Sequence, residues 1–328
     1  MDKILVIDPG KGWGHFVSKM YCYEELSKQL NSKIVFLTKK STQAEHYLKY
    51  SFFCDEVLYL EESKRGLKNL FYNFSAFFKN IKKINKLNFK SCFIFHPSLR
   101  YLFIAKLSNI KDIWGLGLKA QSFFLRKNKK LYLNYNSKTV PHDNEALEFV
   151  KKITGVKSVK FKPFLRSEQN KGDTVGVIIA ASGYEKRWNI YNYVEVIKFL
   201  QSKGFKKFLI ISGLDQKHDE DKIREQIPYD INITFSAEKK IQEVLPFLQK
   251  CIFCIGNDTG FAHLSINIGI NTLIIHGDCP PQYYSNLIHH IDIDNDIERS
   301  ASSIHTISPN KVIDKLSDFL NRRDGRAV

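Results

Sequence analysis

The sequence lacks any long, uninterrupted apolar run. None of its hydrophobic stretches approaches the roughly 20 residues that a membrane-spanning helix needs. Residues 1–15 also lack the ordered basic, apolar and small-residue segments of a secretory signal peptide. We therefore expect a protein that stays in the cytoplasm and contains no transmembrane helix.

Cysteine is sparse, with six residues in a chain of 328. Cys251 and Cys254 form a Cys-x-x-Cys pair, but no second pair follows at the spacing of a zinc ribbon. The pair also lies within an apolar run. This setting favours buried strand cysteines with free thiols over a metal or redox site.

Acidic residues are scarce in the N-terminal half. The whole chain has a formal net charge of +16. Residues 1–170 contain 31 Lys and Arg against 14 Asp and Glu, whereas residues 171–328 contain 19 and 20. The excess either attracts an anionic partner, such as nucleic acid, a membrane surface or an acidic substrate, or serves solubility. No nucleic-acid-reading motif is recognisable, and the basic residues are scattered over a whole domain, so we expect no nucleic-acid partner.

Apolar strand patterns alternate with helical patterns along the whole chain. The expected strands are 3–9, 33–38, 55–60, 91–97, 111–117, 174–182, 206–213, 251–256 and 271–277, and the expected helices are 17–30, 189–204, 239–250 and 260–269. This alternation is typical of parallel sheets covered on both faces. Because 328 residues exceed one ordinary core, we predict an α/β fold of two doubly wound, Rossmann-like domains, 1–165 and 166–328, with a ligand cleft between the carboxyl ends of their strands.

One segment, residues 62–90, combines phenylalanine with lysine. Its apolar residues fall largely on one face of a helix, and its lysines supply the charge: Phe71, Phe74, Phe77, Phe78, Ile81 and Ile84, with Lys79, Lys82, Lys83 and Lys86. The ordinary interpretation is a helix that faces the core and carries a solvated basic side. The alternative is a basic amphipathic helix that lies in a membrane interface or receives an amphiphilic ligand.

Small and polar residues follow three strands of the C-terminal half. Ser182 and Lys186 lie in AASGYEKRWN, where the small residues permit close approach of a ligand and the lysine can meet a phosphate. Asp215 lies in the turn SGLDQ and can hold a ribose hydroxyl. Thr259 and Gly260 stand where a helix begins, so that free N–H groups and the positive end of the helix dipole can receive a pyrophosphate.

Each of these motifs also has an ordinary structural interpretation. Asp258 or Thr259 alone could be a helix cap, and His263 a hydrogen-bonded histidine within the helix. Three such strand ends in one half of the chain, however, are what a nucleotide-sugar pocket requires.

The order ASGYEKRW, ISGLD and IGNDTGFAHLSINIGINTLIIHG resembles the heptosyltransferases of glycosyltransferase family nine. The resemblance is strong over residues 174–281. It is weaker in the N-terminal half, where residues 93–117 are similar to the family's Arg-containing helix and the strand after it. The resemblance implies the GT-B fold, in which two Rossmann-like domains face each other across a cleft. It also implies transfer of heptose from ADP-heptose to the inner core of lipopolysaccharide.

The resemblance further assigns roles to the residues of the donor side. Ser182 would approach the diphosphate, and Lys186 would neutralise it as the sugar departs. Asp258 would hold sugar hydroxyls, the amides of Thr259 and Gly260 would bind the phosphates, and His263 would face the same site. Asp215 would lie near the nucleoside.

The catalytic base is left open between two residues. The family has a Gly-Asp pair in the loop after the first strand, and its aspartate acts as the base. This chain has DPGKGWGHF, which places Gly14-His15 at about that point with one extra residue in the loop. His15 is one candidate, because the pKa of histidine lies near the operating pH, and Asp8 at the strand's end is the other. The remaining possibility is a loop with a structural role only.

The predicted reaction needs no metal or other cofactor. The chain lacks an Asp-x-Asp motif at the donor position, and Asp292-Ile-Asp294 lies beyond it, where a charged surface loop is expected. A helix terminus and Lys186 can stabilise the leaving diphosphate instead. The expected partners are a nucleotide-sugar donor, an anionic glycolipid acceptor, and the inner membrane in peripheral contact with the basic half. Two alternatives remain: another nucleotide sugar used for a surface polysaccharide, and a non-catalytic member that only binds nucleotide sugar.

Overall fold

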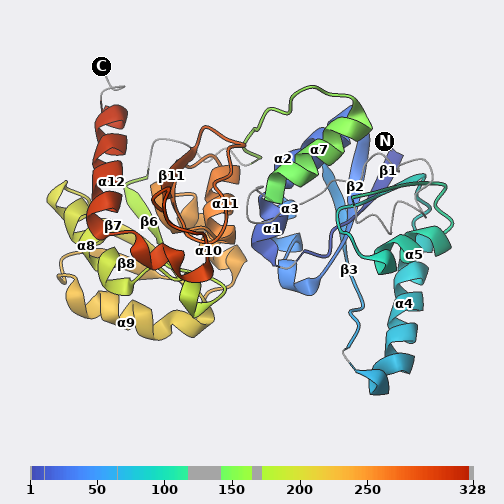
Figure 1. The fold of residues 1–328 in the computed structure, drawn as a ribbon, viewed down its shortest axis with the longest axis horizontal. Coiled ribbons are helices and arrows are strands. Elements are labelled where there is room, and N and C mark those ends of the chain that lie inside the picture. Colours follow the sequence, from blue (N-terminus) through green and yellow to red (C-terminus); the bar gives the residue numbers. More distant parts are fainter. Residues whose placement is uncertain (1, 11, 65, 117–141, 165–171, 325–328) are drawn as a thin grey trace. The chain divides into compact units, whose positions relative to one another are not determined.

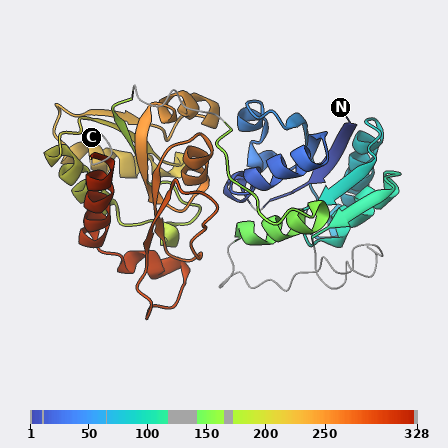
Figure 2. The same cartoon turned by 90° about the horizontal axis from the view of Figure 1, so that it is seen from above.

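The computed structural model describes residues 2–10, 12–64, 66–116, 142–164 and 172–324 (Figure 1). The described residues fall into two compact units, one ending at Phe161 and the other beginning at Lys162. Each unit contains one parallel β-sheet with helices around it (Figures 1 and 2). The predicted α/β class with two parallel sheets is confirmed. The predicted boundary between residues 165 and 166 lies outside the described residues.

The sheet of the first unit has the strand order β3-β2-β1-β4-β5. Its strands are β1 (Asp2–Ile7), β2 (Ser32–Thr38), β3 (Cys54–Tyr59), β4 (Ser91–Ile94) and β5 (Asp112–Gly115). Its helices are α1 (Trp13–Val17), α2 (Met20–Gln29), α3 (Glu45–Leu48), α4 (Leu70–Asn85), α5 (Leu99–Leu107) and α7 (His142–Thr154). The predicted helix 17–30 is present as α2, and α1 is a separate turn of helix before it.

Two different sets of side chains cover the faces of this sheet. One face is aliphatic: Leu5, Val35 and Ile94 pack against Ile84 of α4 and Leu102 of α5. The other is aromatic, since the rings of Phe16, Tyr23, Phe36, Phe95 and Phe149 contact one another edge-on or tilted at centroid distances of 4.9–5.2 Å. Such contacts hold α1, α2 and α7 against the strands and fix the loop that follows β1.

The sheet of the second unit has the strand order β11-β10-β9-β6-β7-β8. Its strands are β6 (Thr174–Ile178), β7 (Lys207–Ile211), β8 (Asn232–Phe235), β9 (Cys251–Asn257), β10 (Thr272–His276) and β11 (Ile288–Asp292). Its α-helices are α8 (Ile190–Ser202), α9 (Lys217–Gln226), α10 (Ile241–Leu248), α11 (Gly260–Asn267) and α12 (Pro309–Asp324), and two short 3₁₀ helices are η4 (Tyr184–Lys186) and η5 (Leu214–Gln216). All neighbouring strands are parallel, so their carboxyl ends lie along one edge.

Alternate strand residues of this sheet, including Val177, Ile210 and Ile255, form one core with α8, α9 and α12. Helix α11 contributes nothing to that core but contacts β9 and β10, and it therefore covers the opposite face. Helix α8 ends at Ser202, and Gly204 follows with φ +91°, as expected for a glycine beyond a helix end. No helix in the described ranges combines the length and the apolar character that crossing a bilayer requires.

Candidate functional site

The predicted donor residues follow neighbouring strands of the second sheet. Ser182 and Lys186 follow β6, Asp215 follows β7, and Asp258 follows β9. In the strand order, β9, β6 and β7 are adjacent, and β10 flanks β9. Because all four strands run parallel, the residues at their carboxyl ends share one edge of the sheet, the usual ligand edge of such folds.

Asn257 ties two of these strand ends together. Its side chain is buried and donates to the carbonyl oxygens of Ile179 and Ala180 at 2.9 and 3.3 Å. Its amide oxygen accepts from the Trp188 backbone N–H at 3.3 Å and from the Tyr193 hydroxyl at 2.7 Å. The asparagine thus fixes the loop after β6 on the end of β9, and its role is structural.

Gly256, directly before this asparagine, permits the close approach. Its φ is +156°, and a Cβ at this position would lie 2.0 Å from the Ile178 carbonyl oxygen. Only glycine allows β6 and β9 to come this close at their carboxyl ends.

Asp258 lies in a group of histidines. Its side chain is 16% exposed, with Oδ1 3.0 Å from His263 Nε2 and Oδ2 3.5 Å from His276 Nδ1. On the far sides of these rings, His263 Nδ1 lies 2.9 Å from the Tyr284 hydroxyl and His276 Nε2 lies 3.0 Å from His290 Nδ1. Burial raises the pKa of Asp258, but the two histidines outweigh this effect and hold its pKa well below the usual range.

The tautomers of the rings set the direction of each hydrogen bond in this network. The Tyr284 hydroxyl donates to His263 Nδ1, and His263 Nε2–H donates to Asp258. His290 Nδ1–H donates to His276 Nε2, while the buried Nδ1 of His276 lies 3.5 Å from the second carboxylate oxygen and has no hydrogen-bond partner among the described residues. The carboxylate is thus oriented by a hydrogen bond from His263 on one oxygen and by the nearby ring of His276 on the other.

His290 makes the stability of this unit sensitive to acid. Burial, followed by the proximity of His276, lowers the pKa of His290 from 6.5 to about 4. His290 therefore takes up a proton near pH 6.5 in the unfolded chain but only near pH 4 in the folded chain. The contribution of neutral His290 to the free energy of unfolding is complete above pH 6.5 and falls as the pH decreases toward 4. We expect His290→Gln to lose less stability than the wild type between pH 7 and 4.5, measured as Tm against pH.

The exposed His305 provides the matched control for this prediction. His305→Gln should follow the wild-type pH profile. Identical profiles for wild type and His290→Gln would contradict the assignment of acid sensitivity to His290.

Thr259 and Gly260 form the N-terminus of α11. Thr259 is the N-cap residue with extended backbone, yet its side chain makes no capping hydrogen bond. Its hydroxyl oxygen is buried and has no partner among the described residues. The first amides of a helix lack intrahelical acceptors, so this end of α11 presents a hydroxyl and free N–H groups beside the Asp258 carboxylate.

Lys186 lies in η4 and is half-buried. Its ammonium group forms an ion pair with Asp278, two residues beyond the end of β10. Partial burial lowers the pKa of Lys186, but the hydrogen bond and charge of Asp278 outweigh it and raise the pKa above the usual value. The pair brings a fully charged lysine to the same sheet edge as Asp258.

Asp215 and Ser182 lie at more open positions. Asp215 is 70% exposed and forms an ion pair with Arg187, whose hydrogen bond lowers the pKa of the carboxyl group. The Nε of Arg187 is buried and has no hydrogen-bond partner among the described residues. Ser182 is exposed in the loop after β6.

Asp8 lies at the end of β1 in the first unit and is almost fully buried. Lys19 and Tyr23 both donate to its Oδ2, and the Gly10 N–H donates to Oδ1 at 3.1 Å. Burial, followed by the charge of Asp8, raises the pKa of Tyr23 well above its usual value. The carboxylate of Asp8 is therefore engaged on both oxygens inside the protein.

His15 occupies the middle of α1 and is half-buried. The turn around it is closed by Ser18, whose hydroxyl donates to the His15 carbonyl at 3.3 Å. Of the two candidates for the base, His15 is thus the more accessible side chain.

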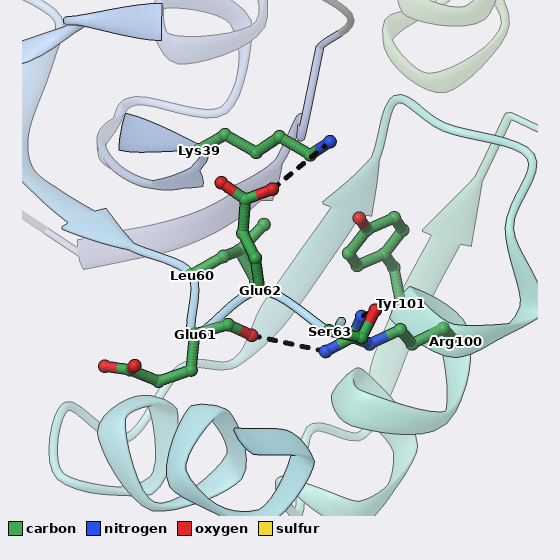
Figure 3. A pocket seen from close by; sticks show the side chains of 7 residues that line it. All are labelled: Lys39, Leu60, Glu61, Glu62, Ser63, Arg100 and Tyr101. Carbon is green, nitrogen blue, oxygen red and sulfur yellow. Dashed lines mark hydrogen bonds and ion pairs between the residues drawn. The ribbon is translucent and has the colours of Figure 1, made fainter. Parts of the chain in front are cut away.

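The first unit also contains a polar cavity of about 90 Å³, shown in Figure 3. Its lining comes from the ends of β2 and β3 and from the start of α5: Lys39, Leu60, Glu61, Glu62, Ser63, Arg100 and Tyr101. The Nζ of Lys39 lies 3.5 Å from Oε2 of Glu62. Arg100 donates to the Ser63 hydroxyl, and to the Glu61 carbonyl oxygen at 3.2 Å. Within the described residues, no carboxylate forms an ion pair with Arg100.

The sequence matches the family model of glycosyltransferase family 9 (heptosyltransferase) over residues 136–308, more than half of the chain. The chain belongs to this family. The predicted resemblance is confirmed, and the protein is a glycosyltransferase. A comparison with curated proteins found no match.

Solved structures show that this family 9 glycosyltransferase has the GT-B fold that was predicted. A family 9 glycosyltransferase from Veillonella parvula is 16% identical with a TM-score of 0.74, over 98% of this chain and 97% of that one. The E. coli ADP-heptose lps heptosyltransferase II is 15% identical with a TM-score of 0.74, over 98% and 99%. The E. coli heptosyltransferase WaaC with ADP is 12% identical with a TM-score of 0.72, over 96% and 99%.

Several site residues of this glycosyltransferase were not predicted. Asp278 pairs with the predicted Lys186, His276 lies beside the predicted Asp258, and His290 contacts His276. The folded sheet brings these residues together. A signal was present for two of them, since His276-Gly277-Asp278 places polar residues at the end of an apolar strand, as the other donor motifs do. The resemblance of residues 93–117 to the family's Arg-containing helix pointed to the segment of Arg100, but nothing in the sequence pattern singled out His290.

The residues considered for metal binding have other partners. Asp292 ends β11 and pairs with Arg299, and Asp294 pairs with Lys311 at 2.5 Å. Cys251 and Cys254 are buried free thiols in β9, as expected for strand cysteines. In the ranges that the structure describes, no group of three or more His, Cys, Asp or Glu is arranged to hold a metal ion.

Proposed function

We propose that this family 9 glycosyltransferase moves a heptosyl group from ADP-heptose to an anionic lipopolysaccharide or lipooligosaccharide core, with inversion and without a metal ion. The observation that carries the proposal is the meeting of Lys186, Asp258 and the N-terminus of α11 at one sheet edge. The structural relatives support the choice of donor, because one is an ADP-heptose lps heptosyltransferase and another is a heptosyltransferase with ADP.

The chemistry at this edge suits a departing nucleoside diphosphate. Cleavage of the bond between the anomeric carbon and the diphosphate oxygen leaves negative charge on the terminal phosphate. Lys186 and the free amides at Thr259 and Gly260 offer positive charge and N–H donors that need no reorganisation as this charge develops. Ser182 approaches the same diphosphate, and no metal is required in this scheme.

Asp258 takes the sugar side of the donor. Its carboxylate is oriented by His263 and His276, and it accepts hydrogen bonds from sugar hydroxyls. The ring of His263 positions this carboxylate. Asp215 with Arg187 borders the nucleoside end of the same edge.

A base must remove the proton from the acceptor hydroxyl while its oxygen attacks the anomeric carbon. We assign this role to His15, because the buried carboxylate of Asp8 is already engaged by Lys19 and Tyr23. Neutral imidazole accepts the proton near neutral pH, and attack opposite the leaving diphosphate inverts the anomeric configuration.

The cavity of the first unit is the candidate site for an anionic group of the acceptor. Arg100 donates there only to neutral oxygens among the described residues, so a carboxylate or phosphate would supply its missing counter-charge. Lys39 adds a second cation at the rim. An acceptor attached to lipid would bring the basic half of the chain to the inner membrane surface, which is also anionic.

Steady-state kinetics with two variants tests this assignment. We expect Asp258→Asn to raise the KM for ADP-heptose by about 10–100-fold with little change for the acceptor, because a charged hydrogen bond to the donor is lost. Arg100→Gln should raise the KM for the anionic acceptor and leave that for the donor unchanged. Lys217→Gln, on the exposed start of α9, serves as the control.

Three outcomes would count against the proposal. Turnover of a different nucleotide sugar in place of ADP-heptose would favour another surface polysaccharide as the product. Donor binding without turnover in the presence of acceptor would indicate a non-catalytic member. Equal effects of both substitutions on both substrates would contradict the separation of donor and acceptor groups.

A further inference from the structure

Helix α4 exposes a row of large apolar side chains at its N-terminal end. Leu70, Phe71, Phe74 and Phe78 are 65, 90, 65 and 47% exposed. Leu70, Phe74 and Phe78 follow one another at intervals of four residues and therefore lie along one line of the helix, with Phe71 beside them. The rings of Phe74 and Phe78 contact each other at 4.7 Å. We refer to these four residues as the aromatic ridge.

The other side of α4 holds the helix on its unit. Ala76, Ile81 and Ile84 are buried in the core, and the fully buried Asn80 bonds the backbone of Glu61 in both directions at 2.9 and 3.0 Å. Figure 1 shows α4 extending from the sheet, with the end that holds the ridge farther away. The helix is thus anchored by its C-terminal half, while its N-terminal half projects into solvent.

The core-facing interpretation of this segment is correct for part of the helix only. It accounts for Ile81 and Ile84, but it is wrong for Phe71, Phe74 and Phe78. A contiguous apolar patch of this kind is rare on a monomeric protein and marks a surface that meets a partner.

The charges around the ridge identify the partner. Helix α4 contains no acidic residue, and Lys82 continues the line of Leu70, Phe74 and Phe78. Lys68, Lys79 and Lys86 are exposed near the same helix. Glutamates of the preceding segment are already paired, Glu61 with Lys83 and Glu62 with Lys39. A second copy of this chain would present the same positive charges and be repelled, whereas an anionic surface is complementary.

We infer that the aromatic ridge inserts into the interface of a bilayer that contains anionic phospholipids. The phenylalanine rings enter the boundary between headgroups and acyl chains, and the lysines meet the lipid phosphates. The lysine stems lie along the apolar boundary while their ammonium groups remain in water. This inference agrees with a lipid-linked acceptor, but it depends on the exposed surface and not on the reaction.

Vesicle sedimentation with the full-length protein tests the inference. We expect tighter binding to vesicles of phosphatidylcholine with about one third phosphatidylglycerol than to phosphatidylcholine alone, and weaker binding as salt is added. Phe71→Ser with Phe74→Ser should weaken binding to the anionic vesicles by at least about tenfold, because two buried rings are lost. Both positions are exposed, so the variant should keep the wild-type Tm.

Tyr191→Ser with Tyr229→Ser is the matched control, because these residues are 53 and 95% exposed in the second unit. This variant should bind like the wild type. Equal binding by the ridge variant and the wild type would overturn the inference, as would a ridge-dependent dimer in sedimentation velocity without vesicle binding. The ridge variant should still transfer sugar to a soluble acceptor. This measurement distinguishes a loss of membrane binding from a failure of the proposed function.

Discussion

Lys186→Gln is expected to lower the kcat of sugar transfer by about 10²–10³-fold, the typical cost of removing one preorganised group from a developing negative charge. Asp278 raises the pKa of Lys186, so the side chain is fully charged at neutral pH. Glutamine keeps most of the length and polarity but removes the charge. The effect should therefore appear in kcat more than in the KM of the donor.

The control for this experiment is Lys207→Gln. Lys207 also pairs with an aspartate, Asp173, but it stands at the amino end of β7, the opposite edge of the sheet. Its replacement should leave kcat within about twofold of the wild type. A Lys186→Gln enzyme with wild-type kcat would remove the lysine from the stabilisation of the leaving group.

Asn257→Ala is expected to destabilise the protein by about 3–5 kcal/mol. The substitution leaves the carbonyl of Ala180 and the N–H of Trp188 without their partner in a buried region, while the carbonyl of Ile179 keeps its hydrogen bond from Gln216 at 3.0 Å. Each unsatisfied buried group costs about 1–3 kcal/mol, and the Tyr193 hydroxyl retains its bond to Ile178. Urea unfolding followed by circular dichroism measures the loss.

The exposed Asn232→Ala, at the start of β8, is the control and should change stability by less than about 0.5 kcal/mol. A loss below about 1 kcal/mol for Asn257→Ala would mean that water replaces the amide at the strand ends. The neighbouring substitution Asp258→Asn should act mainly on donor binding. Adjacent residues of one motif thus separate into a structural and a ligand-binding role.

The central strands that the sequence predicted share one property. β1, β2, β6, β7, β9 and β10 are nearly continuous apolar runs, because both faces of a central parallel strand are buried. The edge strands β3 and β5 of the first sheet were also predicted, whereas the edge strands β8 and β11 of the second sheet were missed. Both missed strands mix polar with apolar residues, with Asn-Ile-Thr-Phe in β8 and Ile-His-His-Ile-Asp in β11. Such mixing is typical of edge strands, which have one neighbour, and short mixed runs resemble loops in a sequence.

The alternation of apolar strands with helices, and the polar residues at the strand ends, belong to the local order of the chain. They were sufficient to predict an α/β fold with parallel sheets and the edge at which Asp258, Thr259 and Lys186 would meet, whereas the GT-B fold and the family came from the resemblance of the motifs to glycosyltransferase family nine. Pairs such as Lys186 with Asp278, or Asp258 with His276, join residues brought together by neighbouring strands, and no periodicity in the sequence encodes them.

Exposure likewise depended on packing in three dimensions. The sequence left the catalytic base open between His15 in the loop and Asp8 at the strand's end, and only the structure shows that Lys19 and Tyr23 engage Asp8. The apolar face of α4 looked uniform, but in the folded unit Ile81 and Ile84 are buried whereas Phe71, Phe74 and Phe78 are exposed. The sequence pattern of a helix specifies which of its faces is apolar. How much of that face is buried depends on the side chains of other elements that contact it in the folded unit.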